Sequence, residues 1–297
     1  MPSTELPVKL RSSFQARVAS VLILLLLVVI GALYFSVKAA TGDAVRSQAK
    51  AQLEVGARVF ERLLDVRGRR LADGVQLLAA DFGFRDAVAS GDSATMRSVL
   101  VNHGKRINAS DMILLGMDGT VLASTLDEVP EGSIFRYDQA LRDARRNRQT
   151  MLMVPLQGMP HLLVEAPVLA PLPIARVVMG LRMDSAFAEE LRSLSNLEVS
   201  FLTIDRQQPG ALVTTQPQVL RHSIVNLMLG QGSRHGVSTT EHLEHSFLSQ
   251  SLVLASDADV QVLALLQSPL DAAMQAFAPL DEKILGIALI ARCRGAP

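Results

Sequence analysis

The chain contains almost no cysteine: Cys293 is the only one among its 297 residues. A single cysteine excludes an internal disulfide and a metal cluster held by several thiolates. The fold must therefore be held together by its own apolar core, for which 49% hydrophobic residues provide ample material. A length of 297 residues allows one large domain or two of ordinary size.

The chain also lacks an excess of either charge. Lys+Arg and Asp+Glu are both 29, so the formal net charge is +0 at pH 7. No basic field is available to attract a phosphate backbone, which excludes nucleic acid as a partner. Serine, histidine and aspartate are present, but they form neither a nucleophile-elbow pattern nor a paired catalytic motif. The sequence therefore predicts no enzyme, no cofactor and no metal.

One long stretch has no charge of either sign. Val18–Val37, VASVLILLLLVVIGALYFSV, is flanked by Arg17 and Lys38. A helix of this length rises roughly 30 Å, the thickness of the hydrocarbon core of a bilayer. A cleaved secretory signal is the alternative, but its apolar region usually runs only about 7–15 residues. We therefore predict a transmembrane helix over 18–38, after a short N-terminal segment of 1–17.

Charges near this helix do not decide its orientation. Basic residues are equally frequent just before and just after the apolar stretch, so the positive-inside rule gives a tie. They are Lys9, Arg11 and Arg17 before it, and Lys38, Arg46 and Lys50 after it. The topology therefore has to come from other evidence.

An amphipathic helical pattern follows from Ala40 to about Ala80. Apolar residues recur at three- and four-residue steps, with charged residues between them. One such helix would hold a domain on the order of 60 Å from the membrane and could transmit a movement. Two ordinary helices broken at Gly68 are the alternative. The apolar stripe is wider than one small domain requires, which is compatible with a homodimer through this helix.

The remaining chain predicts two groups of strands, each accompanied by helices. The first group opens with a hairpin whose turn, Asp118-Gly119, is a strong hairpin signal. Its expected elements are helices at Ser93–Ile107 and Tyr137–Arg146, the hairpin strands Met112–Leu115 and Val121–Ser124, and strands at Thr150–Leu156, Leu162–Leu169 and Arg176–Met183. The second group is expected to contain helices at Ser185–Leu194, Gln218–Leu229 and Leu270–Leu280, and strands at Val199–Ile204, Leu212–Thr215, Phe247–Ala255 and Val260–Gln267.

This grouping predicts the fold class. Grouped strands favour antiparallel sheets, because alternating βαβ units would interleave the strands with long helices. We therefore predict an α+β protein with a transmembrane helix, a long helix and two units. The first unit covers 40–183, including the long helix, and the second covers 184–280.

Part of the sequence resembles a known family. Leu53 to Thr125 is similar to the sensor portion in front of some membrane-bound cyclic-di-GMP enzymes. The matching positions are Val59-Phe60, Leu71, the run AADFGFRDAVASGD that begins at Ala79, Asn102, Arg106-Ile107 and Asp118-Gly119. With the predicted architecture, they make the chain resemble the double Cache domains, tandem PAS-like sensors of bacterial membrane receptors. The resemblance covers the chain from about Ala40 to Pro279.

The resemblance implies a fold, a place in the cell and a function. It implies a membrane-distal Cache unit within 40–183 and a membrane-proximal one within 184–280, each with an antiparallel sheet. It also implies a bacterial inner-membrane protein with a cytoplasmic N-terminus and a periplasmic body. The distal unit would sense a small molecule for signal transduction. A membrane-anchored interaction module without a ligand is the alternative.

The resemblance further suggests where the ligand lies, between the hairpin and the three later strands. Arg136 could hold a carboxylate through two hydrogen bonds there, and Tyr137 could form a wall of the pocket. His161 and Glu165 share one face of a strand because their spacing follows its two-residue period. We expect these four residues to bind the ligand, whose identity the sequence does not reveal.

The C-terminal end departs from the pattern of such receptors. In them a second membrane helix follows the sensor and leads to an output domain. Here Ile284–Ala291 is the only uncharged apolar run, and it is too short to cross a bilayer. We therefore expect 281–297 to be a truncated apolar tail and the output domain to be missing, with a stand-alone sensor that works through a partner as the alternative.

A metal-dependent hydrolase is a remote alternative. His235, His242 and His245 lie near Glu241 and Glu244, and imidazole and carboxylate are zinc ligands. Residues 242 and 245 would share a face on a helix, whereas we predict a loop or a strand here. Solvated polar residues are therefore the preferred interpretation of this cluster.

Overall fold

The computed structural model describes residues 9–107, 109–231, 237–242, 245–256 and 260–270. Contacts divide the chain into two compact units, of which the second is Lys50–Pro269. The second of these contains both sheets, and all contacts discussed below lie within it. The predicted helix at Leu270–Leu280, except for its first residue, and the predicted tail at 281–297 lie outside the described residues.

A single helix, α1 (Lys9–Ala80), includes both the apolar stretch and the amphipathic pattern. The alternative of a break at Gly68 is wrong. Gly68 is buried, and a Cβ placed on it would lie 1.9 Å from the sulfur of Met151. A glycine inside a helix costs about 1 kcal/mol relative to alanine, but here it lets the helix pack closely against the first sheet. Tertiary packing therefore decides the conformation at this position.

The C-terminal part of α1 contacts both halves of the compact unit. The ring of Phe60 lies 5.8 Å from that of Phe201 in the second sheet, and Gln52 donates a hydrogen bond to the carbonyl oxygen of Asn196. Further along, Gly68 faces Met151, which precedes an edge strand of the first sheet. One face of a single helix thus supports two sheets.

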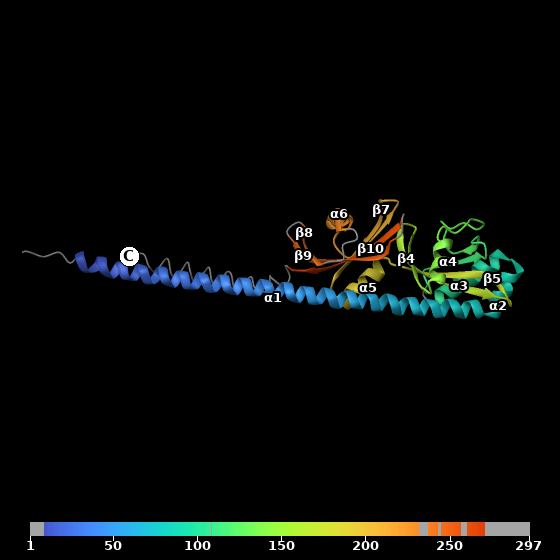
Figure 1. Ribbon diagram of the computed structural model, residues 1–297, viewed down its shortest axis with the longest axis horizontal. Coiled ribbons are helices and arrows are strands. Elements are labelled where there is room, and N and C mark those ends of the chain that lie inside the picture. Colours follow the sequence, from blue (N-terminus) through green and yellow to red (C-terminus); the bar gives the residue numbers. More distant parts are fainter. Residues whose placement is uncertain (1–8, 108, 232–236, 243–244, 257–259, 271–297) are drawn as a thin grey trace, which may run out of the picture. The chain divides into compact units, whose positions relative to one another are not determined.

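The first module, residues 82–182, contains a five-stranded antiparallel sheet with the order β2-β1-β5-β4-β3. Helices α2 and α3 and strands β4 and β5 of this module are labelled in Figure 1. The predicted hairpin is confirmed, and Gly119 in its turn has φ 94°, which glycine adopts without strain. A separate helix at Phe82–Ser90 was not predicted. The elements are α2 (Phe82–Ser90), α3 (Ser93–Ile107), β1 (Asp111–Gly116), β2 (Val121–Ser124), α4 (Asp138–Arg146), β3 (Leu152–Leu156), β4 (Met159–Leu169) and β5 (Pro173–Arg182).

The second module, residues 185–269, repeats this arrangement, with the strand order β7-β6-β10-β9-β8. The predicted helix after residue 184 and most of the predicted strands are confirmed, although β7 begins four residues earlier than expected. The elements are α5 (Ser185–Ser195), β6 (Glu198–Asp205), β7 (Gln208–Thr214), the 3₁₀ turn η1 (Gln218–Leu220), α6 (Arg221–Gln231), β8 (Val237–His242), β9 (His245–Ser256) and β10 (Val260–Pro269). The predicted α+β class with antiparallel sheets is therefore confirmed.

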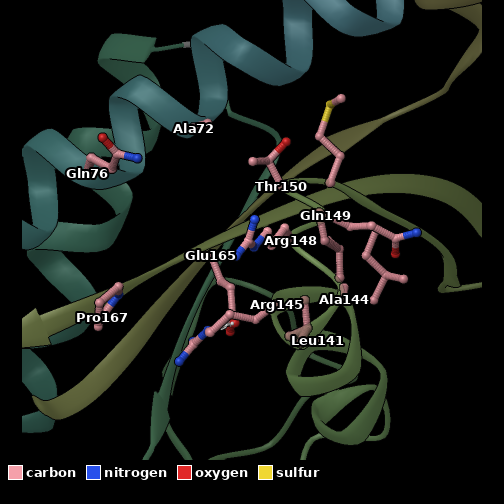
Figure 2. Close-up of a pocket in the computed structure, with 13 residues that line it drawn as sticks. Ala72, Gln76, Leu141, Ala144, Arg145, Arg148, Gln149, Thr150, Glu165 and Pro167 are labelled. Atoms are coloured by element: carbon pink, nitrogen blue, oxygen red, sulfur yellow. Dashed lines mark hydrogen bonds and ion pairs between the residues drawn. The ribbon is translucent and has the colours of Figure 1, made fainter.

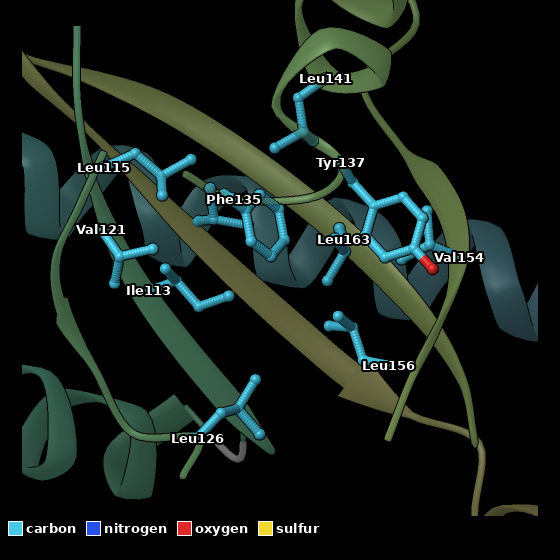
Figure 3. Close-up of a cluster of buried hydrophobic side chains, with 11 residues drawn as sticks. Ile113, Leu115, Val121, Leu126, Phe135, Tyr137, Leu141, Val154, Leu156 and Leu163 are labelled. Atoms are coloured by element: carbon cyan, nitrogen blue, oxygen red, sulfur yellow. The ribbon is translucent and has the colours of Figure 1, made fainter. Parts of the chain in front are cut away.

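The first sheet is covered on both faces. On one face, Leu162 packs near Gly68 of α1 and Met112 packs near Gly104 of α3. The opposite face carries an apolar cluster closed over by the segment before α4 and by α4 itself (Figure 3). Its buried members are Ile113, Leu115, Val121, Leu126, Phe135, Tyr137, Leu141, Val154, Leu156, Leu163 and Val178. We call this side of the sheet the α4 face.

Candidate functional site

Helix α4 places charged side chains over the α4 face of the first sheet. Its first turn carries Asp138, and its last turn carries Arg145 and Arg146, which suits the helix dipole at both ends. Leu141 and Ala144 are buried and hold the helix on the sheet. The polar side of the helix therefore lies beside the sheet strands β4 and β5.

A buried arginine connects this helix to the sheet. Arg176 in β5 is 1% exposed and forms ion pairs with Asp138 of α4 and Glu165 of β4. Each carboxylate has a second arginine partner from α4. Arg142 Nε lies 2.8 Å from Asp138 Oδ2, and Arg145 Nε lies 2.8 Å from Glu165 Oε1. The network thus consists of five side chains of alternating charge, in the order Arg142, Asp138, Arg176, Glu165 and Arg145.

The network fixes the charge of Asp138. Burial raises the pKa of this carboxyl, but hydrogen bonds from Arg176 and Arg142 outweigh it, so the pKa lies below its ordinary value. Asp138 is therefore ionised at neutral pH. The Asp138 carboxylate fits beside Gly119 because this residue has no side chain: a Cβ there would lie 2.5 Å from Asp138 Oδ2.

A cavity of about 380 Å³ opens at the edge of this network (Figure 2). Helix α1 contributes Ala72 and Gln76 to its wall, and β4 contributes Glu165. The other lining residues are Leu141, Ala144, Arg145, Arg148, Gln149, Thr150, Met151, Leu152, Leu163 and Pro167. We call it the α1–α4 cavity. It combines an apolar wall with a few charged groups, which is the usual composition of a small-molecule site.

The four residues expected to bind the ligand do not meet in one cavity. Glu165 lines the α1–α4 cavity, whereas Arg136 and Tyr137 line a smaller one of about 240 Å³. His161 is among the lining residues of neither. The register does place His161 and Glu165 on the same face of β4, as the two-residue period predicts.

Arg136 already holds a carboxylate, but that carboxylate belongs to the protein. Its Nη1 and Nη2 lie 2.8 and 2.7 Å from the two oxygens of Asp205 at the end of β6. These hydrogen bonds lower the pKa of Asp205. Arg136 thus links the first module to the second. The sequence pattern did not indicate Asp205 as its partner.

Tyr137 and His161 are also committed to internal contacts. The Tyr137 hydroxyl donates a hydrogen bond of 2.7 Å to the carbonyl oxygen of Pro155, and burial raises its pKa. Tyr137 precedes α4 rather than beginning it. His161 is fully buried, with Nδ1 2.8 Å from the Met159 carbonyl oxygen and Nε2 2.9 Å from Asp111 Oδ2.

With this geometry established, comparison with known proteins gives the family. A family model described as "Double sensory domain of two-component sensor kinase" matches residues 46–268, most of the chain. The chain belongs to the double Cache family. A search of curated proteins found no significant match.

Solved sensor and ligand-binding domains are similar to this chain at low sequence identity. The sensor domain of the histidine kinase DctB from V. cholerae is 17% identical, with a TM-score of 0.45, and the match covers 76% of this chain and 98% of that one. The ligand-binding domain of the Campylobacter jejuni chemoreceptor Tlp3, solved with L-norvaline, is 11% identical, with a TM-score of 0.49 and coverage of 79% and 94%. That of the Pseudomonas fluorescens chemoreceptor CtaA, solved with L-isoleucine, is 14% identical, with a TM-score of 0.46 and coverage of 79% and 98%.

The charged network of this double Cache domain was missed by sequence reasoning. Arg176 and Arg182 lie in a strand that otherwise reads as apolar, and their spacing of six residues places them on one face of it. Two arginines at even spacing in a buried strand are a signal for buried carboxylate partners. Following that signal would have led to Asp111, which pairs with Arg182, and to Asp138, which pairs with Arg176.

The histidine cluster proposed as a metal site belongs to the second Cache module. Among the side chains that the structure describes, no group of three or more His, Cys, Asp or Glu residues is placed to hold a metal ion. His235, Glu241, His242, Glu244 and His245 lie outside those described side chains. The metal-site interpretation therefore stays an untested alternative.

Proposed function

We propose that this protein is a membrane-anchored sensor that binds a small molecule in the α1–α4 cavity of its first module. The cavity itself carries the proposal. It has a volume of about 380 Å³, and its wall joins Glu165 of the sheet, Arg145 of α4 and Ala72 of the long helix. A ligand bound there would contact α1 directly. Binding would then favour one of two positions of the helix, which is how such a signal could reach the membrane.

The apolar part of α1 supports the membrane anchor. The segment beginning at Arg17 contains a window with mean hydropathy 2.9, none of which is buried in the structure. Large side chains such as Leu24 and Val28 are 63% exposed, and lipid would cover them. In this proposal the N-terminus is cytoplasmic and the sheets are periplasmic, so the first module is the membrane-distal one. Output through cyclic-di-GMP enzymes remains a prediction from the sequence resemblance alone.

Filling the cavity tests the proposed site. The full chain in lipid nanodiscs is screened by calorimetric unfolding against organic acids, amino acids, polyamines and divalent metals. A compound present at one hundred times its Kd stabilises the folded protein by about 2.7 kcal/mol. Ala72→Phe introduces a ring into the wall of the cavity and is expected to abolish that stabilisation.

Ala51→Phe is the matched control, because Ala51 lies on an exposed part of the same helix. It should leave the response to the compound unchanged. If the compound stabilises the Ala72→Phe variant as strongly as the wild type, its site is elsewhere. If no compound binds the wild type, the sensor proposal fails and the interaction module becomes the better description.

A specific observation favours the interaction module as a second candidate. Three large apolar residues of α1, Val55, Val66 and Leu77, are 50%, 48% and 69% exposed. Their spacing of eleven residues places them close to one line along the helix, because eleven residues make almost three full turns. This line offers a contact for α1 of a second copy. The homodimer stays a proposal.

A charge on this line should separate the copies. We expect Val66→Glu to shift the full chain in nanodiscs or detergent from dimer to monomer by sedimentation equilibrium, because two carboxylates would meet in a symmetric contact. Glu61→Lys changes charge on the same helix at roughly 140° around its axis and should leave the dimer intact. A monomeric wild type would contradict the dimer directly.

A further inference from the structure

Helix α4 ends in a turn with a left-handed position, which is usually occupied by glycine. The amide of Gln149 donates to the carbonyl oxygen of Ala144 at 2.8 Å, and that of Arg148 donates to Arg145 at 3.0 Å. These two bonds form a Schellman motif, whose residue after the C-cap adopts the left-handed conformation. Here that residue is Arg148, with φ 57°. A side chain in this conformation costs about 1 kcal/mol or more relative to glycine.

The side chain of Arg148 lines the α1–α4 cavity together with Glu165 and Thr150 (Figure 2). An unfavourable backbone conformation at the edge of a cavity is a reason to ask what the side chain does there. Among the described residues, no Asp or Glu oxygen forms an ion pair with Arg148, whereas Arg145 and Arg146 each have one. Within the described part of the chain, the cavity therefore presents one guanidinium, that of Arg148, without an ion-pair partner.

The acidic side of the cavity is already neutralised. Glu165 is the one acidic residue in the described lining of the cavity, and its oxygens face Arg145 and Arg176. A bound ammonium group would have to displace one of these arginines. A bound carboxylate could pair with Arg148 directly, with its apolar part against Leu141, Leu152 and Leu163.

We propose that Arg148 binds the carboxylate of a small organic acid with an apolar body, in preference to an α-amino acid. This inference rests on the proposed ligand site and specifies its chemistry. Arg148 acts as the anion-binding residue, and the apolar wall selects the rest of the molecule. The left-handed turn after α4 places Arg148 among the residues that line the cavity.

Glycine at this position separates the role of the side chain from that of the backbone. The full chain in lipid nanodiscs is titrated with butyrate by isothermal calorimetry, with butyramide as the uncharged analogue. We expect saturable binding of butyrate and none of butyramide. Arg148→Gly should weaken butyrate binding by at least about tenfold, because it removes a charge-assisted hydrogen-bond pair. Its unfolding midpoint should equal or exceed that of the wild type, because glycine relieves the left-handed turn.

Arg206→Gly is the matched control. Arg206 also has a left-handed backbone, with φ 48°, but it lies in the turn between β6 and β7. It should keep or raise the midpoint and leave butyrate binding unchanged. Arg148→Asn serves as a second variant, since asparagine tolerates the left-handed conformation, and it should also lose binding.

Undiminished butyrate binding by Arg148→Gly and Arg148→Asn would overturn the inference. So would equal binding of butyrate and butyramide. A compound of another class that binds the wild type, loses its effect in Ala72→Phe and ignores Arg148→Gly would overturn the ligand class while supporting the cavity as the sensor site. The two proposals therefore fail in distinguishable ways.

Discussion

Replacing Arg176 by alanine is expected to destabilise the double Cache domain by about 3–5 kcal/mol. Its side chain is 2% exposed, and the two carboxylates that it holds, Asp138 and Glu165, are only 12% and 10% exposed. Removing the guanidinium leaves both carboxylates buried on one side of the sheet. Arg142 and Arg145 still pair with them, but both arginines reach in from the surface and cannot fill the space between the strands. Urea denaturation of the full chain at pH 7 measures the loss.

Arg146→Ala provides the comparison. Arg146 belongs to the same helix and pairs with Asp143, but its side chain is 74% exposed. Exposed ion pairs contribute little, so we expect a change within about 0.5 kcal/mol. If the two variants lose similar amounts of stability, the network does not hold α4 on the sheet.

The effect of Arg176→Ala should depend on pH. The pKa of Asp138 is lower in the folded protein than its ordinary value of 3.8. A depressed pKa means that the folded state binds fewer protons, so its contribution is present above pH about 4 and is lost as the pH falls through the folded value. The difference between wild type and Arg176→Ala should therefore shrink as the pH is lowered below about 4. A difference that grows on acidification would contradict the assignment.

Local signals predicted most of the fold. The Asp118-Gly119 turn and the helix at Ser93–Ile107 depend on neighbouring residues, and both are found as predicted. Gly68 shows the limit of such signals. Its low helix propensity suggested a break, whereas the contact with Met151, 83 residues later, keeps the helix intact. Propensity is a property of a short segment, and packing against a distant strand outweighs it.

The candidate site was harder to predict, because its contacts join distant parts of the chain. The chemistry of Arg136 suits a carboxylate, as the sequence indicates, but its partner Asp205 lies 69 residues away in another module. The Arg176–Asp138 pair spans 38 residues. Nothing in the sequence marks Arg148 as the residue that takes the left-handed position after α4. Only the fold brings the two members of each pair together, and only the fold places Arg148 in the wall of the α1–α4 cavity.

The second large effect is expected from Phe60→Ala, at about 3–5 kcal/mol. Phe60 is fully buried where α1 meets the second sheet, with its ring 5.8 Å from that of Phe201. Phe201 in turn lies 6.0 Å from Phe187 of α5. Truncation therefore removes one ring of three and leaves a cavity between helix and sheet. Val219→Ala, at a position 71% exposed in the same module, should change stability by no more than about 0.5 kcal/mol.

Phe60→Ala also tests how α1 is held by each module. Phe60 contacts the second sheet, whereas Gly68 and Gly74 lie against residues of the first module. Hydrogen exchange should therefore lose protection mainly in β6 and β10, while β1 and β5 keep theirs. That pattern would mean that the helix can loosen from one sheet while it remains on the other, which a sensor needs if a ligand in the first module is to shift α1. Equal loss of protection in both sheets would mean that the compact unit opens as a whole, and the helix could not move independently of its modules.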